Sequence, residues 1–435
     1  MANLDFKCPC CGGALNFDNK SQNIVCPYCD TEFSANDLKA YTDDIAETGK
    51  EDTSWDESQV QAYTNEDTKD IKIYTCESCG GEIIADETTS STCCPYCGNN
   101  LVVSKELNGD LKPNYIIPFK KDKDFAFDAL KSFIRKRPLL PGSFSKTNKM
   151  QEVQALYVPF WIFDADVDGR VRYEGTIVRK YVQGDYDVRE EKHYSVVRDG
   201  GIGFTHVPVD GSKKMQDQLM ESIEPFDFNQ AEPFNAAYLA GYRADRYDVS
   251  KEETFNRATT RFRQGTEQAF RRDIHGYDTL EVKESTLQFS NTEARYALYP
   301  VWLLHTLWND KHFYFAVNGE SGKIAGNLPI SKGKFSFFLF LFLLIFGGAI
   351  FGIVYAVSGD LAISALIGPI AGLLIAILIM VGMRRKMKNV RFQYGAANYE
   401  KPNSLRITGR KDIYLYKKVT RTKRASSSSS SNRRR

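Results

Sequence analysis

Eight cysteines in the N-terminal part of the chain repeat one metal-ligand spacing twice. Each set reads C-x2-C, fourteen residues, C-x2-C, and both second pairs are Cys-Pro-Tyr-Cys. Four thiolates that converge from two such pairs form the closed tetrahedral shell of a structural Zn²⁺. We therefore predict two structural zinc ions, the first held by Cys8, Cys11, Cys26 and Cys29 and the second by Cys76, Cys79, Cys94 and Cys97.

Each cysteine set predicts a small β-rich zinc ribbon, at residues 1–33 and 71–105. Such ribbons have cores too small to fold alone, so metal binding is expected to supply most of their folding free energy. The alternative is a disulfide framework, which needs an oxidising compartment, and no secretory signal precedes Cys8. The two remaining cysteines, Cys10 and Cys93, are expected to be non-ligating thiols.

The sequence offers no motif for catalysis. Four thiolates close the zinc shell, which leaves no position for a reactive water. The turn Gly319–Lys323 is too short for a phosphate-binding loop, and the five histidines form no diagnostic pair with an acidic partner. Because no motif combines a nucleophile, a base and an oxyanion donor, we expect that the chain is not an enzyme.

Two apolar runs near the C-terminal end predict a membrane-spanning helical hairpin, residues 335–383. Residues 335–357 and 361–383 contain no charged side chain, and each run is long enough to cross roughly 30 Å of hydrocarbon as a helix. The alternative is a pair of buried core helices. Only three residues separate the runs, so both flanks must lie on the same side of the membrane.

Basic residues flank this hairpin on both sides, whereas its short loop carries only Asp360. The positive-inside rule then places both termini in the cytoplasm of a multi-pass cell-membrane protein. A reducing cytoplasm also agrees with unpaired cysteines that hold zinc. Each helix has one Gly-x-x-x-Gly pair, Gly348 with Gly352 and Gly368 with Gly372. We expect these glycines to pack inside the hairpin, and assembly between chains is the alternative.

The remaining soluble part divides into an acidic linker at 34–70, flexible or weakly helical, and an α+β domain at 113–330. Apolar periodicity predicts helices at 124–137 and 250–274, the latter with a capping box at Ser250. Alternating segments predict an antiparallel sheet. The expected strands are 157–163, 167–173, 176–182, 193–197, 280–289, 296–308 and 312–317.

The last segment, 384–435, is predicted to be a basic, partly disordered cytoplasmic tail. It has a net charge of +15, so residues 1–383 have a net charge of −13. Attraction to anionic lipid is the expected role of this charge, and nucleic-acid binding stays open. The predicted membrane-surface residues are Arg384, Arg385, Lys386, Lys388, Lys417, Lys418, Arg421, Lys423 and Arg424.

Two similar phrases occur in the soluble part, Tyr157-Val158-Pro159-Phe160-Trp161 and Tyr299-Pro300-Val301-Trp302. Together with the paired ribbons, the Val317-Asn318-Gly319 turn before Leu328-Pro329-Ile330 and the apolar hairpin, they resemble a family of bacterial membrane proteins. These are described as transcription-factor-IIB-type zinc-ribbon-containing proteins. The resemblance implies association with phage-shock-protein-A-like and flotillin-like proteins at the cell envelope.

Two functions remain at this stage. The first is a membrane-anchored zinc-ribbon adaptor that recruits protein partners to the cytoplasmic face of the membrane, with envelope stress as the expected setting. The alternative is a membrane-tethered nucleic-acid-binding protein related to replication or transcription. Neither ribbon is basic, and phosphate binding needs clustered Lys and Arg, so protein recognition is favoured. The lipid bilayer is the other expected partner.

Overall fold

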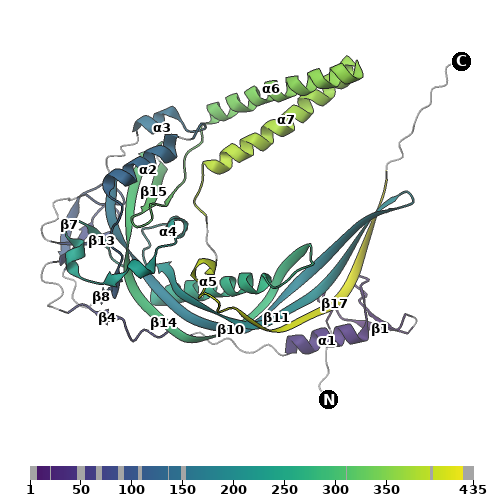
Figure 1. Cartoon of the computed structure of the whole chain (residues 1–435), viewed down its shortest axis with the longest axis horizontal. Coiled ribbons are helices and arrows are strands. Elements are labelled where there is room, and N and C mark those ends of the chain that lie inside the picture. The colour runs from purple at the N-terminus through teal and green to yellow at the C-terminus, as the bar shows by residue number, and fades with distance from the viewer. Residues whose placement is uncertain are drawn as a thin grey trace.

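The computed structural model describes most of the chain (Figure 1). The described residues are 7–19, 21–46, 54–64, 71–86, 93–105, 110–135, 137–147, 153–309, 311–391 and 395–424. They contain two groups of four cysteines, a sheet-rich domain and two long apolar helices. The predicted fold class is confirmed at this level. The serine run and Arg433 to Arg435 of the predicted disordered tail lie outside the described residues.

A sheet of four long antiparallel strands forms the body of the molecule, in the order β14-β10-β11-β17. Figure 1 shows β10, β11 and β17 curving together toward one free end, which we call the strand arm. The predicted strands 157–163, 167–173 and 176–182 are all parts of one continuous strand, β10. Only Gly184 and Asp185 separate β10 from β11. The bounds are β10 Gln154–Gln183, β11 Tyr186–Asp210, β14 Thr279–Trp308 and β17 Arg406–Lys423.

The two similar sequence phrases pair with each other at the centre of the sheet. Tyr157 faces Pro300 and Val158 faces Tyr299 in an antiparallel register. Each strand also takes one short parallel neighbour at the start of its phrase or just before it: β10 pairs with β13 (Arg243–Asp245), and β14 pairs with β9 (Tyr115–Ile116). The local arrangement is thus nearly two-fold symmetric, which a duplication of this sheet element would produce.

Helix α5 (Lys251–Arg271) packs its apolar stripe against β10, β11 and β14. Ser250 caps the helix by accepting a hydrogen bond from the N–H of Glu253 at 3.3 Å, as the sequence predicts. Phe262 and Phe270 are fully buried against the sheet. Arg261, on the same helix, forms a buried bidentate ion pair with Glu224, at 2.9 and 2.7 Å.

The sheet extends beyond the boundaries predicted for the soluble domain. β6 (Glu82–Asp86), from the second ribbon, pairs with β13, and β17, from the predicted tail, pairs with β11 along most of its length. The predicted boundaries 113–330 are therefore too narrow, because the sheet also includes β6 and β17. The segment 384–435 is not a separate tail, because most of β17 belongs to the sheet. Strand pairing over long sequence separations leaves no local periodic signal, so the sequence hides these connections.

The predicted flexible linker, 34–70, also contains ordered structure where it is described. Residues Ala35–Ala46 form α1, which packs beside β17. Trp55 inserts among aromatic side chains of the sheet and α5, with ring centroids 4.8 Å from Phe163 and 5.3 Å from Phe262. The acidic composition of the linker does not reveal this anchor, because it depends on a single half-buried tryptophan.

Shorter elements complete the fold and support the ribbons and the helices. Helix α2 agrees with the prediction within two residues. The remaining elements are β1 Asn16–Asp18, β2 Asn23–Val25, β3 Glu32–Phe33, β4 Gln61–Ala62, β5 Ile71–Cys76, β7 Leu101–Lys105, β8 Leu111–Lys112, α2 Lys123–Arg135, α3 Gly142–Thr147, α4 Asp217–Ile223, η2 Phe228–Gln230, β12 Glu232–Pro233, η3 Ala236–Leu239, β15 Lys311–Asn318, β16 Ile324–Gly326 and η4 Ala397–Tyr399.

The two apolar runs form helices α6 (Lys332–Ser358) and α7 (Leu361–Lys386), which pack against each other. Gly359, in the left-handed region at φ 66°, ends α6, and the Asp360 carboxylate caps α7 by accepting from the N–H of Ala362 at 2.8 Å. Both helices are long and apolar enough to cross a membrane.

Glycines bring α6 and α7 close together, but only one of the two predicted glycine pairs lies in the contact. Gly368 and Gly372 of α7 face Gly347 of α6, whereas Cβ atoms at Gly348 and Gly352 would meet nothing within 4 Å. The expectation of packing inside the hairpin is correct for α7 and wrong for α6. The helix rotation that decides this is set by tertiary contacts.

Leucine at Gly372 is expected to separate the two helices. A Cβ atom there would lie 2.4 Å from the Gly347 backbone, which no rotamer can relieve. Overpacking of this kind costs about 1–3 kcal/mol or more. The temperature of thermal aggregation in detergent should fall for Gly372→Leu and stay unchanged for the control, Gly352→Leu, which adds the same apolar volume in open space. Equal temperatures for both variants would contradict the observed helix contact.

Candidate metal centres

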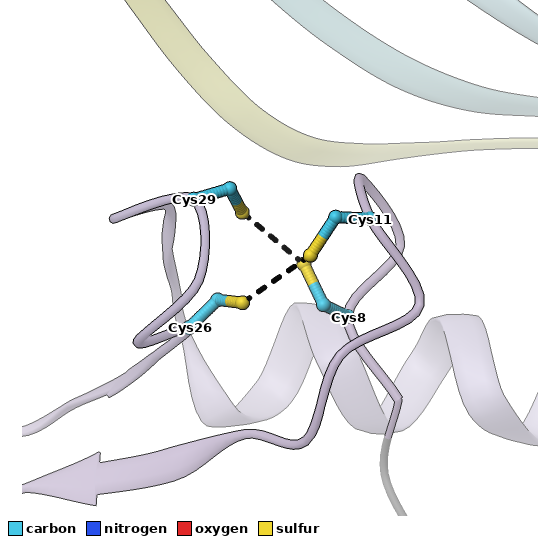
Figure 2. A group of neighbouring side chains, drawn as sticks. All are labelled: Cys8, Cys11, Cys26 and Cys29. Atoms are coloured by element: carbon cyan, nitrogen blue, oxygen red, sulfur yellow. Dashed lines mark hydrogen bonds between the residues drawn. The ribbon is translucent and has the colours of Figure 1, made fainter.

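Each cysteine set brings four sulfur atoms to one point. In the first set, the Sγ atoms of Cys8 and Cys29 lie 3.6 Å apart and those of Cys11 and Cys26 lie 3.5 Å apart. Figure 2 shows the four side chains pointing toward one another from two loops. The second set repeats this cross-pairing, with 3.5 Å between Cys76 and Cys97 and 3.6 Å between Cys79 and Cys94.

These separations suit a tetrahedral thiolate site. A metal with bonds of about 2.3 Å to sulfur places its ligands roughly 3.8 Å apart, so only small adjustments are needed. The distances are far longer than a disulfide bond, and all ten cysteines are free. Both groups therefore fit a metal ion, and the disulfide alternative does not describe this structure.

The same backbone turn presents the sulfurs in all four Cys-x2-Cys loops. The N–H of the residue after the loop donates to the carbonyl of its first cysteine, at 2.7 to 2.9 Å. That residue has a positive φ each time, which explains why glycine occupies three of the four positions. The four residues are Gly12, Asp30, Gly80 and Gly98.

One thiol in each set is more acidic than an ordinary cysteine. The hydroxyl of Thr31, 3.3 Å from the sulfur, lowers the pKa of Cys29 to about 6. Burial acts to raise the pKa of Cys76, but the backbone N–H groups of Cys79 and Ser78 outweigh it and lower that pKa to about 7. A thiol that is partly ionised near neutral pH favours the first step of metal capture.

The second ribbon is built into the core of the sheet domain. Cys76 and Cys94 are fully buried in one cluster with Leu156 and Val158 of β10. Tyr96, in the Cys-Pro-Tyr-Cys loop, is only 4% exposed. Two further contacts with this ribbon leave no signal in the cysteine spacing. Lys214 donates a hydrogen bond to the Cys79 carbonyl at 2.6 Å, and Arg243 donates one to the Cys93 carbonyl.

The first ribbon stands apart from that core. Its three short strands, β1, β2 and β3, form their own sheet, and its small cluster contains Cys8, Cys26, Phe33 and Leu38. The equivalent tyrosine, Tyr28, is 73% exposed. Phe33 contacts the domain at Tyr416 of β17, where the two rings pack edge to face at 6.0 Å.

The structure separates the predicted membrane-surface residues into two groups. Arg384, Arg385, Lys386 and Lys388 lie at and just after the end of α7. Figure 1 shows that end far from β17 and the strand arm. The second group lies at the exposed end of the sheet, on or just after β17: Lys417, Lys418, Arg421, Lys423 and Arg424.

The chain is thus a protein with two four-cysteine groups that could each hold a metal ion, a sheet domain, and two helices of membrane-spanning length. The chain is 30% identical over 331 residues to the uncharacterized protein YdjG of Bacillus subtilis (strain 168). The match covers 76% of this chain and 92% of YdjG, so the chain belongs to the YdjG family. No family model matches the chain, and no solved structure matches it.

Proposed function

We propose that this protein is a zinc-ribbon adaptor, anchored in the cell membrane by α6 and α7, that recruits protein partners to the cytoplasmic face. The observation that carries the proposal is the physical connection between ribbon and helices. The second ribbon joins the sheet through β6 and β13, and side chains of β15 in the same sheet share a hydrophobic cluster with Phe335 of α6 and Met380 of α7. There the N–H of Leu328, just after β16, donates to the Met387 carbonyl at 2.9 Å.

The exposed surfaces of the helices support membrane anchorage. Leu378 is 71% exposed and Ile353 is 64% exposed, and apolar side chains of this kind cover both helices. Such a surface is stable in lipid and unfavourable in water. The basic residues at the end of α7 support a cytoplasmic location of both termini.

Local charge supports a protein partner for the first ribbon. Asp30, Glu32 and Asp37 lie beside its metal site, and they would repel nucleic-acid phosphates. Four thiolates per site suit zinc in a structural role. The proteins to test first as partners are phage-shock-protein-A-like and flotillin-like proteins, on the strength of the family resemblance.

Affinity purification of the full chain from detergent-solubilised membranes tests the proposal. The ligand variant Cys26→Ser should lose its protein partners while it stays in the membrane fraction, because only the first ribbon unfolds. Cys93→Ser is the control, since it makes the same change at an exposed cysteine that lies outside both four-sulfur groups and away from the first ribbon. A chain that is soluble without detergent, or partners that stay bound to Cys26→Ser, would contradict the proposal.

A further inference from the structure

A groove separates the first ribbon from the last strand of the sheet. It has a volume of about 800 Å³. One wall comes from the ribbon, at Asp30 to Ser34, and the other from β17, at Tyr414 to Val419. Figure 2 shows this strand passing close to the first metal site. Cys11 and Cys29 lie at the border of the groove, so an intact metal site is needed to hold the ribbon wall in place.

The groove follows the edge of β17 and does not lie over one face of it. Six consecutive residues of the strand, Tyr414 to Val419, line the groove. Side chains of a strand point alternately to opposite faces, so a cavity over one face would be lined by every second residue. The groove is therefore open to the backbone of the strand along roughly 20 Å.

This backbone edge is free to accept another strand. In the part of the chain that the structure describes, β17 pairs only with β11. The outward N–H and C=O groups of Tyr414 to Val419 make no further hydrogen bond within the described residues. An unpaired strand edge is a template for an extended peptide, which gains affinity from main-chain hydrogen bonds.

Two lysines of β17 indicate which charge a peptide in the groove should carry. Lys417 and Lys418 are exposed, and neither forms an ion pair with any described residue. The opposite wall carries Asp30, Glu32 and Asp37, of which Glu32 accepts a hydrogen bond from Asn23 at 3.3 Å and Asp37 accepts one from Ser34 at 2.6 Å. A strand that adds to β17 has the two lysines, and not these carboxylates, as its cross-strand neighbours. Opposite charges across paired strands stabilise the pairing, so acidic side chains are expected where the peptide faces β17.

The same lysines disfavour two other occupants. A second copy of β17 would bring lysines and arginines against lysines, and like charges on facing strands repel. The chain's own residues after Arg424 contain three arginines and no acidic group.

We propose that this groove binds an extended acidic segment of a partner protein, which adds as a strand to the edge of β17. The inference rests on the proposed adaptor function and identifies the chemistry of its partner. The ribbon then acts as a metal-stabilised wall that holds the peptide against the strand.

Fluorescence anisotropy with the full chain in detergent micelles tests the proposal. The probe is a fluorescein-labelled ten-residue peptide in which valine alternates with glutamate. The wild-type chain should bind it, and the double variant Lys417→Glu/Lys418→Glu should bind at least about tenfold more weakly. Arg421→Glu/Lys423→Glu is the matched control, with the same charge change on the same strand outside the groove, and it should bind as the wild type does.

Two further measurements separate strand addition from general attraction of charge. N-methylation of two adjacent central residues of the probe blocks both of its edges, so it should abolish binding. Bound probe should also slow hydrogen exchange of the amides in residues 414–419. Equal weakening by both double variants, or undiminished binding of the methylated probe, would overturn the proposal.

The other occupants give distinct results. Probe binding that appears only after truncation at Arg424 would assign the groove to the chain's own C-terminal segment and overturn the proposal. If the wild-type chain forms dimers and the substitution Lys417→Glu/Lys418→Glu dissociates them, the groove binds a second copy of the chain and the proposal is overturned. If cellular partners stay on this double variant but leave Cys26→Ser, the adaptor function stands and the groove assignment fails.

Discussion

Serine at Cys94 is expected to unfold the sheet domain, whereas serine at Cys26 should unfold the first ribbon alone. Both changes remove one of four thiolates, and structural zinc contributes about 10–16 kcal/mol of folding free energy in small zinc domains. The difference lies in the surroundings. Cys94 shares a buried cluster with Leu156 and Val158, at the centre of the sheet, whereas the cluster around Cys26 contains few residues.

Thermal unfolding followed by circular dichroism in detergent measures this difference. Cys94→Ser should lose most of the cooperative β-sheet transition, because the lost metal energy is comparable with the whole stability of a domain, about 5–15 kcal/mol. Cys26→Ser should keep that transition, and each variant should retain one zinc ion per chain. Cys93→Ser and Cys10→Ser, which alter exposed cysteines outside the four-sulfur groups, are the controls. Equal loss of the transition in both ligand variants would show that the ribbons are not independent.

Alanine at Glu224 is expected to produce the second large effect. Glu224 is 1% exposed, pairs with Arg261 through two hydrogen bonds and accepts a third from the Tyr399 hydroxyl at 2.8 Å. Removing one partner of a buried ion pair leaves an uncompensated charge and costs about 3–5 kcal/mol. Because Tyr399 belongs to the segment that leads into β17, the variant should also loosen that strand.

Chemical denaturation of the full chain measures this cost. The control is Arg272→Ala, which breaks an ion pair with Glu400 that joins the same helix to the same segment. Arg272 is 55% exposed, so that pair should contribute about 0–1 kcal/mol. The double variant Glu224→Leu/Arg261→Met should recover much of the lost stability, since apolar side chains can replace a buried pair. If Glu224→Ala lowers the free energy of unfolding by less than Arg272→Ala does, the ion pair of Glu224 with Arg261 is hydrated and the prediction is wrong.

The strand arm shows why part of this fold is hidden in the sequence. Tyr414 and Tyr416 alternate with Ile413 and Leu415, which predicts a short strand, yet the structure extends it to 18 residues. The polar and charged residues around this core become strand because β11 offers a long partner edge. A charge-rich segment is read as a disordered tail until the partner strand is known.

The local signals were sufficient for the two four-cysteine groups and the apolar helices. Cys-x2-Cys spacing with a glycine after the loop specifies its own turn, and a long uncharged apolar run specifies a helix, because both depend on residues close in sequence. Tertiary structure alone decided that one ribbon is part of the core and the other stands apart. It also decided which glycines join α6 to α7, and that β17 borders a groove. These features depend on contacts between residues distant in the chain, where burial and strand pairing, and not local sequence pattern, set the free energy.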